Sequence, residues 1–182
     1  DALVHTKYGD VLPSNKALAG AGIELIGMER REFLLKDALE QVKPDYDFIF
    51  IDCPPSLELL TLNALCAADA ILVPVQGEYF ALEGLSDLMN TVRIVRRSLN
   101  PRLELEGVLL TMFDGRTNLA LQVAQEVKHY FPGKVYATVI PRNVRLSEAP
   151  SHGKPITSYD RTSRGAEAYT AFAAEFLDKQ SA

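Results

Sequence analysis

The sequence lacks a long apolar run and an N-terminal targeting segment. Among its 182 residues, the best apolar stretch runs from Ala64 to Val75 and is interrupted by Asp69. It therefore falls short of the ~20 residues that cross a bilayer. The first residues also lack the basic-then-apolar pattern of a secretory signal. We expect a soluble, cytoplasmic protein that does not enter a membrane.

Cysteine is scarce as well. Cys53 and Cys66 are too few for a disulfide framework, and no Cys/His cluster with metal-ligand spacing accompanies them. Both are expected to be reduced thiols. Cys66 falls in the apolar stripe of a predicted helix, which favours a buried small hydrophobic side chain over the alternative of an iron–sulfur ligand.

Positive charge is sparse in the first half of the chain and concentrated in the second. Residues 1–90 hold 6 Lys/Arg against 15 Asp/Glu, a net charge of −9, whereas residues 91–182 hold 13 against 9, a net charge of +4. The basic half is rich in arginine, whose guanidinium matches phosphate geometry. Its arginines are Arg93, Arg96, Arg97, Arg102, Arg116, Arg142, Arg145, Arg161 and Arg164. A solvated, salt-bridged surface explains most of them, so composition alone leaves nucleic-acid binding open.

Short apolar runs alternate with longer segments of helical periodicity, and we find no internal repeat, low-complexity tract or interdomain linker. This alternation predicts an α/β fold, with a mostly parallel sheet flanked by helices, in a single domain over residues 1–182. One predicted strand ends at 10–13, and the other predicted strands span 48–51, 70–75, 105–112 and 135–140. One predicted helix begins after a cap at Ser14 or Asn15. The other predicted helices span 33–39, 61–67, 82–99, 119–131 and 166–177.

The run Phe48–Ile51 is the most informative of the predicted strands. It is continuously apolar, as expected of a central parallel strand covered on both faces. It delivers Asp52 to the carboxyl edge, where open α/β sheets bind ligands. A carboxylate there can hold Mg²⁺ through water, and two prolines, Pro54 and Pro55, stiffen the exit. The alternative is that Asp52 caps the next helix.

Six blocks in order resemble the ParA/Soj family of chromosome and plasmid partition ATPases. The blocks are Asp52-Cys-Pro-Pro-Ser, Thr61-Leu-Asn-Ala-Leu, Val73-Pro-Val-Gln, Tyr79-Phe-Ala-Leu-Glu-Gly, Thr111-Met-Phe-Asp-Gly-Arg-Thr and Ile140-Pro-Arg-Asn-Val-Arg-Leu-Ser-Glu-Ala-Pro. The resemblance runs from about Val11 to Phe176, and the block from Ile140 to Lys154 is the most specific for this family.

The resemblance implies a P-loop ATPase with a deviant Walker A motif that uses ATP and Mg²⁺. Such a protein forms an ATP-sandwiched homodimer, binds DNA on the nucleoid without sequence preference, and releases it after hydrolysis stimulated by a ParB-type partner. Asp52 matches the Walker B aspartate, a water-mediated Mg²⁺ site. Met112 and Pro141 match apolar contacts to the adenine, and Asn143 matches a polar one.

Arg116 and Arg145 match the arginines through which proteins of this family hold DNA. Both follow predicted strand ends in loops that contain glycine or asparagine, where phosphates can reach them. Phosphate contacts give affinity without sequence readout and make binding strongly salt-dependent. The alternative is that these arginines neutralise Asp114 or Glu148.

The sequence departs from the family in one respect: it holds no Lys-Gly-Gly-x-Gly-Lys-Thr loop. Gly20, Gly22 and Gly27 lie in or beside a predicted helix without a following Lys-Ser/Thr. We expect the loop, its helix and an Asp-x-Asp strand to precede Asp1. Without backbone N–H groups and a lysine to hold phosphates, the 182 residues alone are expected to be inactive, whereas the parent protein would hydrolyse ATP.

Two alternative functions remain. A MinD-like membrane-cycling ATPase needs a basic amphipathic tail, but the tail from Ala174 to Ala182 is short and not basic. An inert DNA-binding or interaction fragment is the second alternative. An upstream in-frame P-loop would distinguish the ATPase from the fragment.

Overall fold

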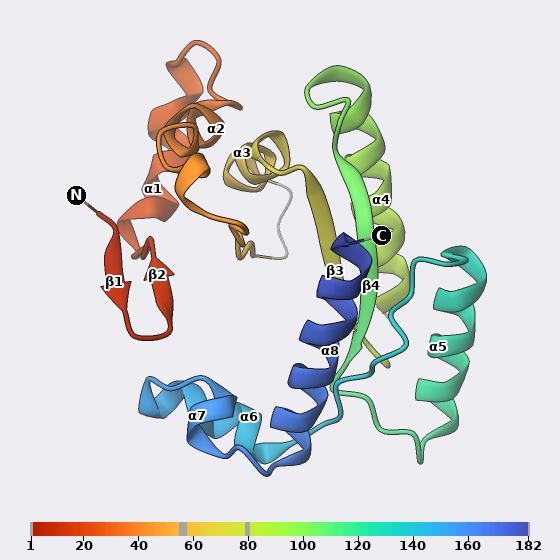
Figure 1. The fold of residues 1–182 in the computed structure, drawn as a ribbon. Coiled ribbons are helices and arrows are strands. Elements are labelled where there is room, and N and C mark those ends of the chain that lie inside the picture. The colour runs from red at the N-terminus through yellow and green to blue at the C-terminus, as the bar shows by residue number, and fades with distance from the viewer. Residues whose placement is uncertain (1, 55–57, 79–80, 182) are drawn as a thin grey trace. The chain divides into compact units, whose positions relative to one another are not determined.

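The computed structural model describes residues 2–54, 58–78 and 81–181 (Figure 1). The chain divides into two compact units, Asp1–Ala70 with Leu88–Glu104 and Ile71–Asp87 with Leu105–Ala182. The first unit is mostly helical, and the second holds most of the β3–β4 sheet. The single domain predicted over residues 1–182 stays a prediction.

The first unit opens with a hairpin of two short strands, β1 (Val4–Thr6) and β2 (Gly9–Val11), which pair antiparallel. β2 overlaps the strand end predicted at 10–13, whereas β1 is an additional strand. After the hairpin, the side chain of Asn15 accepts a hydrogen bond from the N–H of Ala17 at 2.8 Å. The helix predicted after Ser14 or Asn15 is therefore present, but its N-cap is Lys16, which has no capping side-chain hydrogen bond. Asn15 makes a turn before the helix and does not cap it, so the predicted cap residue is wrong.

The rest of the first unit is built from helices joined by two buried asparagines. The helices are α1 (Ala17–Glu24), α2 (Leu34–Leu39), α3 (Leu59–Ala67) and the second half of α4 (Ala81–Ser98), with 3-10 turns at Leu25–Gly27 and Lys43–Asp45. Asn63 donates to the carbonyl of Arg31 at 2.8 Å and accepts from the N–H of Leu35 at 3.1 Å. These bonds hold α3 against the start of α2, since a buried amide is costly unless its hydrogen bonds are satisfied.

The predicted central strand at 48–51 is wrong for this structure. The segment has no regular secondary structure, and neither of the two-stranded sheets of the described residues, β1–β2 and β3–β4, includes it. Phe50 is 73% exposed, and its ring lies 6.4 Å from that of Phe48. The physical reason is that a strand is stabilised by packing and pairing with its neighbours, and apolar composition alone does not supply them.

The second unit contains most of a parallel β-α-β arrangement. Strands β3 (Ala70–Gln76) and β4 (Glu104–Thr111) are neighbours that point the same way and are connected through α4 (Figure 1). Residues 134–141 run parallel beside β4, with hydrogen bonds from the N–H of Val108 to the carbonyl of Lys134 at 2.8 Å and from the N–H of Ile140 to the carbonyl of Leu110 at 2.9 Å. The predicted strand at 135–140 therefore lies where expected, although it pairs through isolated bridges.

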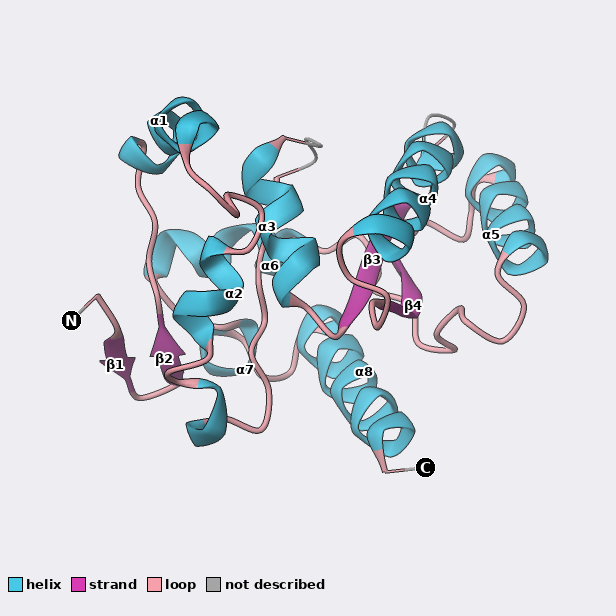
Figure 2. Ribbon diagram, turned by 90° about the horizontal axis from the view of Figure 1, so that it is seen from above, coloured by secondary structure: helices cyan, strands magenta, loops and turns pink. Residues whose placement is uncertain are grey.

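Helices α5 (Asn118–Tyr130) and α8 (Arg164–Gln180) cover opposite faces of the β3–β4 sheet (Figures 1 and 2). Two shorter helices that the sequence did not predict, α6 (Val144–Glu148) and α7 (Ile156–Tyr159), lie between them in the chain. None of the helices in the described ranges has the length and hydrophobicity of a membrane span.

The core on the α8 side centres on Tyr136, which is 1% exposed and packs with Leu109, Ile140 and Phe172. The hydroxyl of Tyr136 donates to Glu106 at 2.6 Å. Gly107 makes this packing possible, because a Cβ there would lie 2.5 Å from the ring. The segment 134–141 is thus fixed to β4 by side chains as well as by its backbone.

Candidate functional site

The end of β4 brings Met112 and Pro141 to one edge of the second unit. The N–H of Phe113 donates to the carbonyl of Ile140 at 3.0 Å, and Phe113 pairs in parallel with Pro141. Met112 and Pro141, which the sequence places in separate loops, therefore lie in adjacent segments at the carboxyl end of β4. This is the edge at which open α/β sheets bind ligands.

Met112 has a backbone conformation that its sequence did not reveal. Its φ is +47°, in the left-handed region that residues other than glycine rarely occupy. Such a conformation costs of order 1–3 kcal/mol and is found preferentially at functional sites. Its side chain is 44% exposed, so an apolar group is available at this edge.

Asn143 begins helix α6. Its side-chain oxygen accepts a hydrogen bond from the N–H of Arg145 at 2.9 Å, which caps the helix. The oxygen is therefore engaged, and the amide NH₂ is the end of the side chain that can donate to a ligand. This donor is two residues from Pro141 in the chain.

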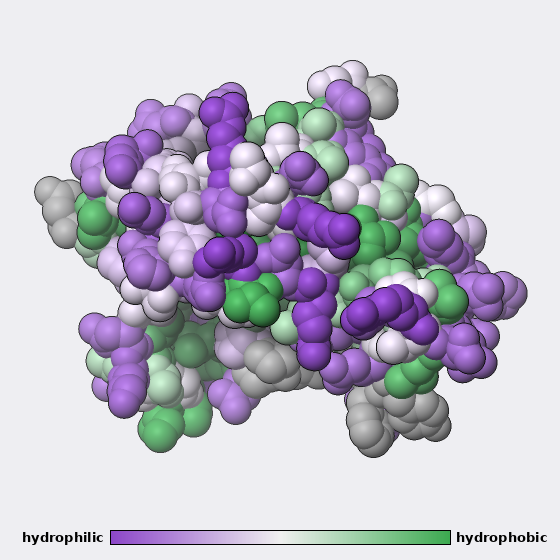
Figure 3. Space-filling view, turned by 90° about the horizontal axis from the view of Figure 1, so that it is seen from below, coloured by the Kyte–Doolittle hydropathy of each residue, from purple (hydrophilic) through white to green (hydrophobic). Residues whose placement is uncertain are grey.

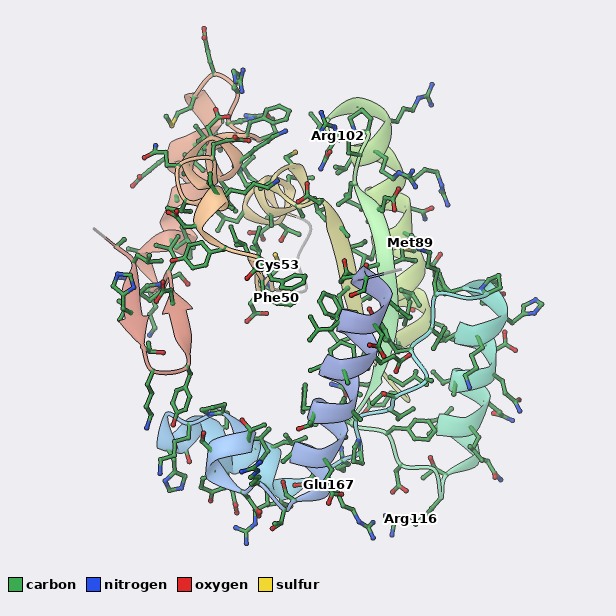
Figure 4. All side chains as sticks on the ribbon, in the orientation of Figure 1. Phe50, Cys53, Met89, Arg102, Arg116 and Glu167 are labelled. Carbon is green, nitrogen blue, oxygen red and sulfur yellow. The ribbon has the colours of Figure 1, made fainter. Side chains whose placement is uncertain are left out.

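Arg116 lies in the loop between β4 and α5, and its side chain is 89% exposed (Figure 4). Its Nε donates to Asp114 Oδ1 at 2.8 Å, and its Nη2 donates to Asp114 Oδ2 at 2.7 Å. These bonds lower the pKa of Asp114 to about 2. The loop thus holds a two-pronged ion pair in contact with solvent, the geometry in which arginine binds carboxylate or phosphate alike.

Arg145 is held by two carboxylates. Its Nη1 donates to Glu148 at 2.8 Å, and its Nε lies 3.3 Å from Asp160. The hydroxyl of Tyr159 also donates to Glu148, at 3.1 Å. Hydrogen bonds from Arg145 and Tyr159 lower the pKa of Glu148, so the carboxylate stays charged beside the arginine.

Both arginines therefore form the ion pairs that the alternative hypothesis predicted, Arg116 with Asp114 and Arg145 with Glu148. Sequence spacing suggests Asp114 and Glu148 as partners, but it misses Asp160, which lies 15 positions beyond Arg145 and follows a helix that the sequence did not predict. Ion pairs at the surface contribute little to stability and exchange readily. Pairing with a carboxylate is consequently compatible with phosphate binding.

Strongly hydrophilic side chains occupy much of the face seen from below, with hydrophobic patches among them (Figure 3). Helices α6 and α7 lie on the side of the second unit from which this view is taken (Figure 1). Arg145 belongs to α6 and so lies on this side of the second unit.

Asp52 belongs to the first unit and is exposed, in the irregular segment that follows Ile51. In the ranges that the structure describes, no group of three or more His, Cys, Asp or Glu side chains could enclose a metal ion. Because Mg²⁺ keeps several waters and takes only one or two protein carboxylates, a single exposed carboxylate fits water-mediated binding. That Asp52 and Pro141 belong to one nucleotide site, as the resemblance implies, stays a prediction, since the two residues belong to different units.

Parts of two predicted blocks lie outside the described residues, namely Pro55, Ser56, Tyr79 and Phe80. Of the two cysteines, Cys66 is 1% exposed, which confirms the predicted buried side chain, whereas Cys53 is exposed.

Comparisons with known proteins agree on one family. A family model described as an AAA domain matches residues 2–105. The chain is 65% identical over 166 residues to the sporulation initiation inhibitor protein Soj of Bacillus subtilis, covering 91% of this chain and 66% of that protein. It is 52% identical over 184 residues to the chromosome partitioning protein ParA of Caulobacter vibrioides, covering 99% and 69%. The chain thus spans about two thirds of the length of these relatives.

A solved structure supports the fold class. Cobyrinic acid a,c-diamide synthase from Mycobacterium smegmatis, with bound ADP and magnesium, superposes with a TM-score of 0.83 at 38% identity and covers 100% of this chain and 67% of its own. Together with the family match, this similarity confirms the predicted P-loop NTPase-like α/β fold.

Proposed function

Because the chain belongs to the ParA/Soj family of chromosome-partitioning ATPases, we propose that it acts in the ATP-dependent segregation of DNA. The full-length protein would bind ATP and Mg²⁺, form a homodimer, hold DNA without sequence preference and release it when a ParB-type partner stimulates hydrolysis. The observation that carries the proposal is the pairing of Phe113 with Pro141, which brings together two predicted nucleotide-contact loops. Arg116 and Arg145 follow these loops in the sequence.

The nucleotide base would lie against the edge formed by Met112 and Pro141. The exposed methionine side chain and the proline ring offer apolar contact to a flat purine. The amide NH₂ of Asn143 can donate to a ring nitrogen, because the oxygen of this side chain already caps α6. Apolar contact with a few fixed polar groups is the usual composition of such a site.

Asp52 would hold Mg²⁺ through water, and the ion would supply charge neutralisation for the phosphates when bound. The exposed position of the carboxylate supports this role, because the hydrated ion needs space as well as charge. The relative with bound ADP and magnesium, 38% identical to this chain, supports the use of the same ligands here.

DNA would bind at Arg116 and Arg145. In this proposal, phosphates take the place of Asp114 on the first arginine and of Glu148 or Asp160 on the second. Exchange at Arg116 requires little rearrangement, since the side chain is 89% exposed and bound to one carboxylate. Arg145 is oriented by two carboxylates and is therefore presented in a more defined position. We expect the protein to work in the cytoplasm at the nucleoid, without membrane attachment.

The experiment that tests the proposal compares Arg116→Ala/Arg145→Ala with the unchanged full-length protein in the presence of Mg-ATP. Affinity for duplex DNA of any sequence should fall, and the plot of log affinity against log salt should flatten by about 0.9 for each phosphate that the variant no longer binds. ATP binding should be unchanged, because neither arginine belongs to the proposed nucleotide edge.

The matched control is Lys128→Ala/Lys134→Ala, which removes two exposed positive charges at and beyond the far end of α5. Its salt slope should equal that of the unchanged protein. If the arginine double variant also keeps the original slope, Arg116 and Arg145 have a structural role and the DNA assignment is wrong.

A further inference from the structure

A second basic region lies on the carboxyl-terminal half of α4, in the first unit. Arg93, Arg96 and Arg97 line a pocket of about 400 Å³, together with Met89, Val92 and Pro101. The positions 89, 92, 93, 96 and 97 recur at helical spacing, so these side chains share one face of α4. Arg102 extends from the turn that follows, and Met89 lies farther along the helix (Figure 4).

The arginines of this pocket differ in their partners from Arg116 and Arg145. In the described ranges, neither the three pocket arginines nor Arg102 form an ion pair, and all four are exposed. Arg93 donates to the side-chain oxygen of Asn90 at 2.8 Å, a neutral partner. The helix dipole favours Arg96 and Arg97 in the last turn, but it does not account for Arg93 or for the pocket. These cations are available for an anionic ligand.

The floor of the pocket is apolar. Val92 is 2% exposed, Met89 is partly buried, and Pro101 also lines the pocket. None of the lining residues is aromatic, so a nucleic-acid base has no ring on which to stack. An apolar centre with an arginine-rich border is instead the composition of protein–protein interfaces, where arginine is enriched.

Hydrogen bonds hold the backbone turn at the end of the pocket that contains Pro101. Asn100, 8% exposed, donates to the carbonyls of Leu65 at 2.9 Å and Ala68 at 2.8 Å, and its N–H donates to the carbonyl of Val95 at 2.8 Å. These bonds anchor the turn that carries Pro101 to the end of α3. A pre-formed surface loses less conformational entropy on binding.

We propose that this arginine pocket binds an acidic segment of a partner protein. Carboxylates of the segment would pair with Arg93, Arg96 and Arg97, whose guanidinium forks match carboxylate geometry. One apolar side chain of the segment would enter the pocket above Met89 and Val92. The proposal does not depend on the nucleotide or DNA assignments, which concern the second unit and Asp52.

The three methionines of the chain, Met28, Met89 and Met112, allow a direct test by methyl NMR. The 182-residue chain, labelled with carbon-13 at its methionine methyl groups, is titrated with a short helical peptide of glutamates that carries two leucines one helical turn apart. The Met89 methyl signal, assigned with Met89→Leu, should shift saturably, while the signals of Met28 and Met112 stay in place. The position of the Met112 signal separates this site from the proposed nucleotide edge.

Two variants and two altered probes sharpen the test. Arg93→Ala/Arg96→Ala/Arg97→Ala should weaken peptide binding about tenfold or more, whereas Lys16→Ala/Lys128→Ala/Lys134→Ala, which removes the same charge from exposed sites elsewhere, should not. Replacing both leucines of the peptide by serine should also weaken binding about tenfold, because the apolar floor is left unfilled. Peptide binding without movement of the Met89 signal would overturn the proposal. So would a short DNA duplex that shifts this signal at lower concentration than the peptide does.

Discussion

Two runs predicted as strands, residues 48–51 and residues 135–140, are both rich in apolar residues but differ in structure. The second run lies beside β4, bound through its backbone at Lys134, Tyr136 and Ile140, and Tyr136 and Ile140 are buried. The first run is irregular, and the Phe50 side chain is 73% exposed. Apolar composition therefore selects candidates for strands, whereas the neighbouring backbone and the packing on both faces decide which candidates form.

The same difference separates the two parts of the candidate site. Pro141 follows the run that is fixed in the sheet, and it meets Phe113. Asp52 follows the run 48–51, which belongs to neither sheet of the described residues. A nucleotide site needs the base contacts near Pro141 and the Mg²⁺ contact of Asp52, together with groups that hold the phosphates. We therefore expect the 182 residues alone to bind nucleotide poorly.

The largest expected effect is the loss of nucleotide binding in the 182-residue chain relative to the full-length protein. The sequence contains no glycine-rich loop ending in Lys-Ser/Thr, and phosphate affinity depends mainly on such a loop and its lysine. Titration calorimetry with Mg-ATP should detect no binding. Micromolar affinity in the isolated chain would mean that a segment within residues 1–182 holds the phosphates, in place of a glycine-rich loop.

Core substitutions test the comparison between the two runs directly. Ile140→Ala removes a side chain that is 2% exposed and should lower the free energy of unfolding by about 2–5 kcal/mol. Phe50→Ser in the irregular run should lower it by less than about 1 kcal/mol. Urea unfolding followed by circular dichroism measures both. Equal losses would show that the run 48–51 is packed in solution as firmly as the run 135–140.

Two glycines give a finer test of the same packing. Gly107→Ala places a methyl group 2.5 Å from the Tyr136 ring and 2.9 Å from the carbonyl oxygen of Lys134, and such overpacking costs about 1–3 kcal/mol. Gly84→Ala on α4 meets nothing within 4 Å and should stabilise the helix by up to about 1 kcal/mol. Opposite signs in thermal unfolding are expected. A neutral Gly107→Ala would mean that residues 134–141 are free to move away from β4.

Much of the fold follows from local sequence signals. Helices α4, α5 and α8 were predicted to within a few residues because their apolar positions recur at helical spacing. The short helices α6 and α7 were missed, since five and four residues are too few for a periodic pattern. The hairpin strand β1 was missed for the same reason.

The candidate site was predictable only in part. The resemblance of sequence blocks identified Met112, Pro141, Asn143, Arg116 and Arg145, and the structure brings Met112 beside the Pro141 segment. The positive φ of Met112 and the contact of Arg145 with Asp160 had no sequence signal. Both depend on how distant segments meet, and no residue type at these positions reveals it.

The smallest expected effect concerns the loop after β4, in the second unit, where the run 135–140 is bound beside this strand. The pKa of Asp114 is lowered from 3.8 to about 2, chiefly by its hydrogen bonds with Arg116. A lowered pKa in the folded protein means that the pair stabilises the loop fully above pH 3.8 and loses this contribution as the pH falls through about 2. Carboxyl NMR at low salt should therefore give a midpoint near 2 for Asp114, and Arg116→Ala should return it toward 3.8. The control is Arg145→Ala, a change in helix α6, which should leave the Asp114 midpoint unchanged. If Asp114 already titrates near 3.8 in the unaltered chain, the two-pronged ion pair does not persist in solution, and Arg116 meets DNA without a carboxylate to displace.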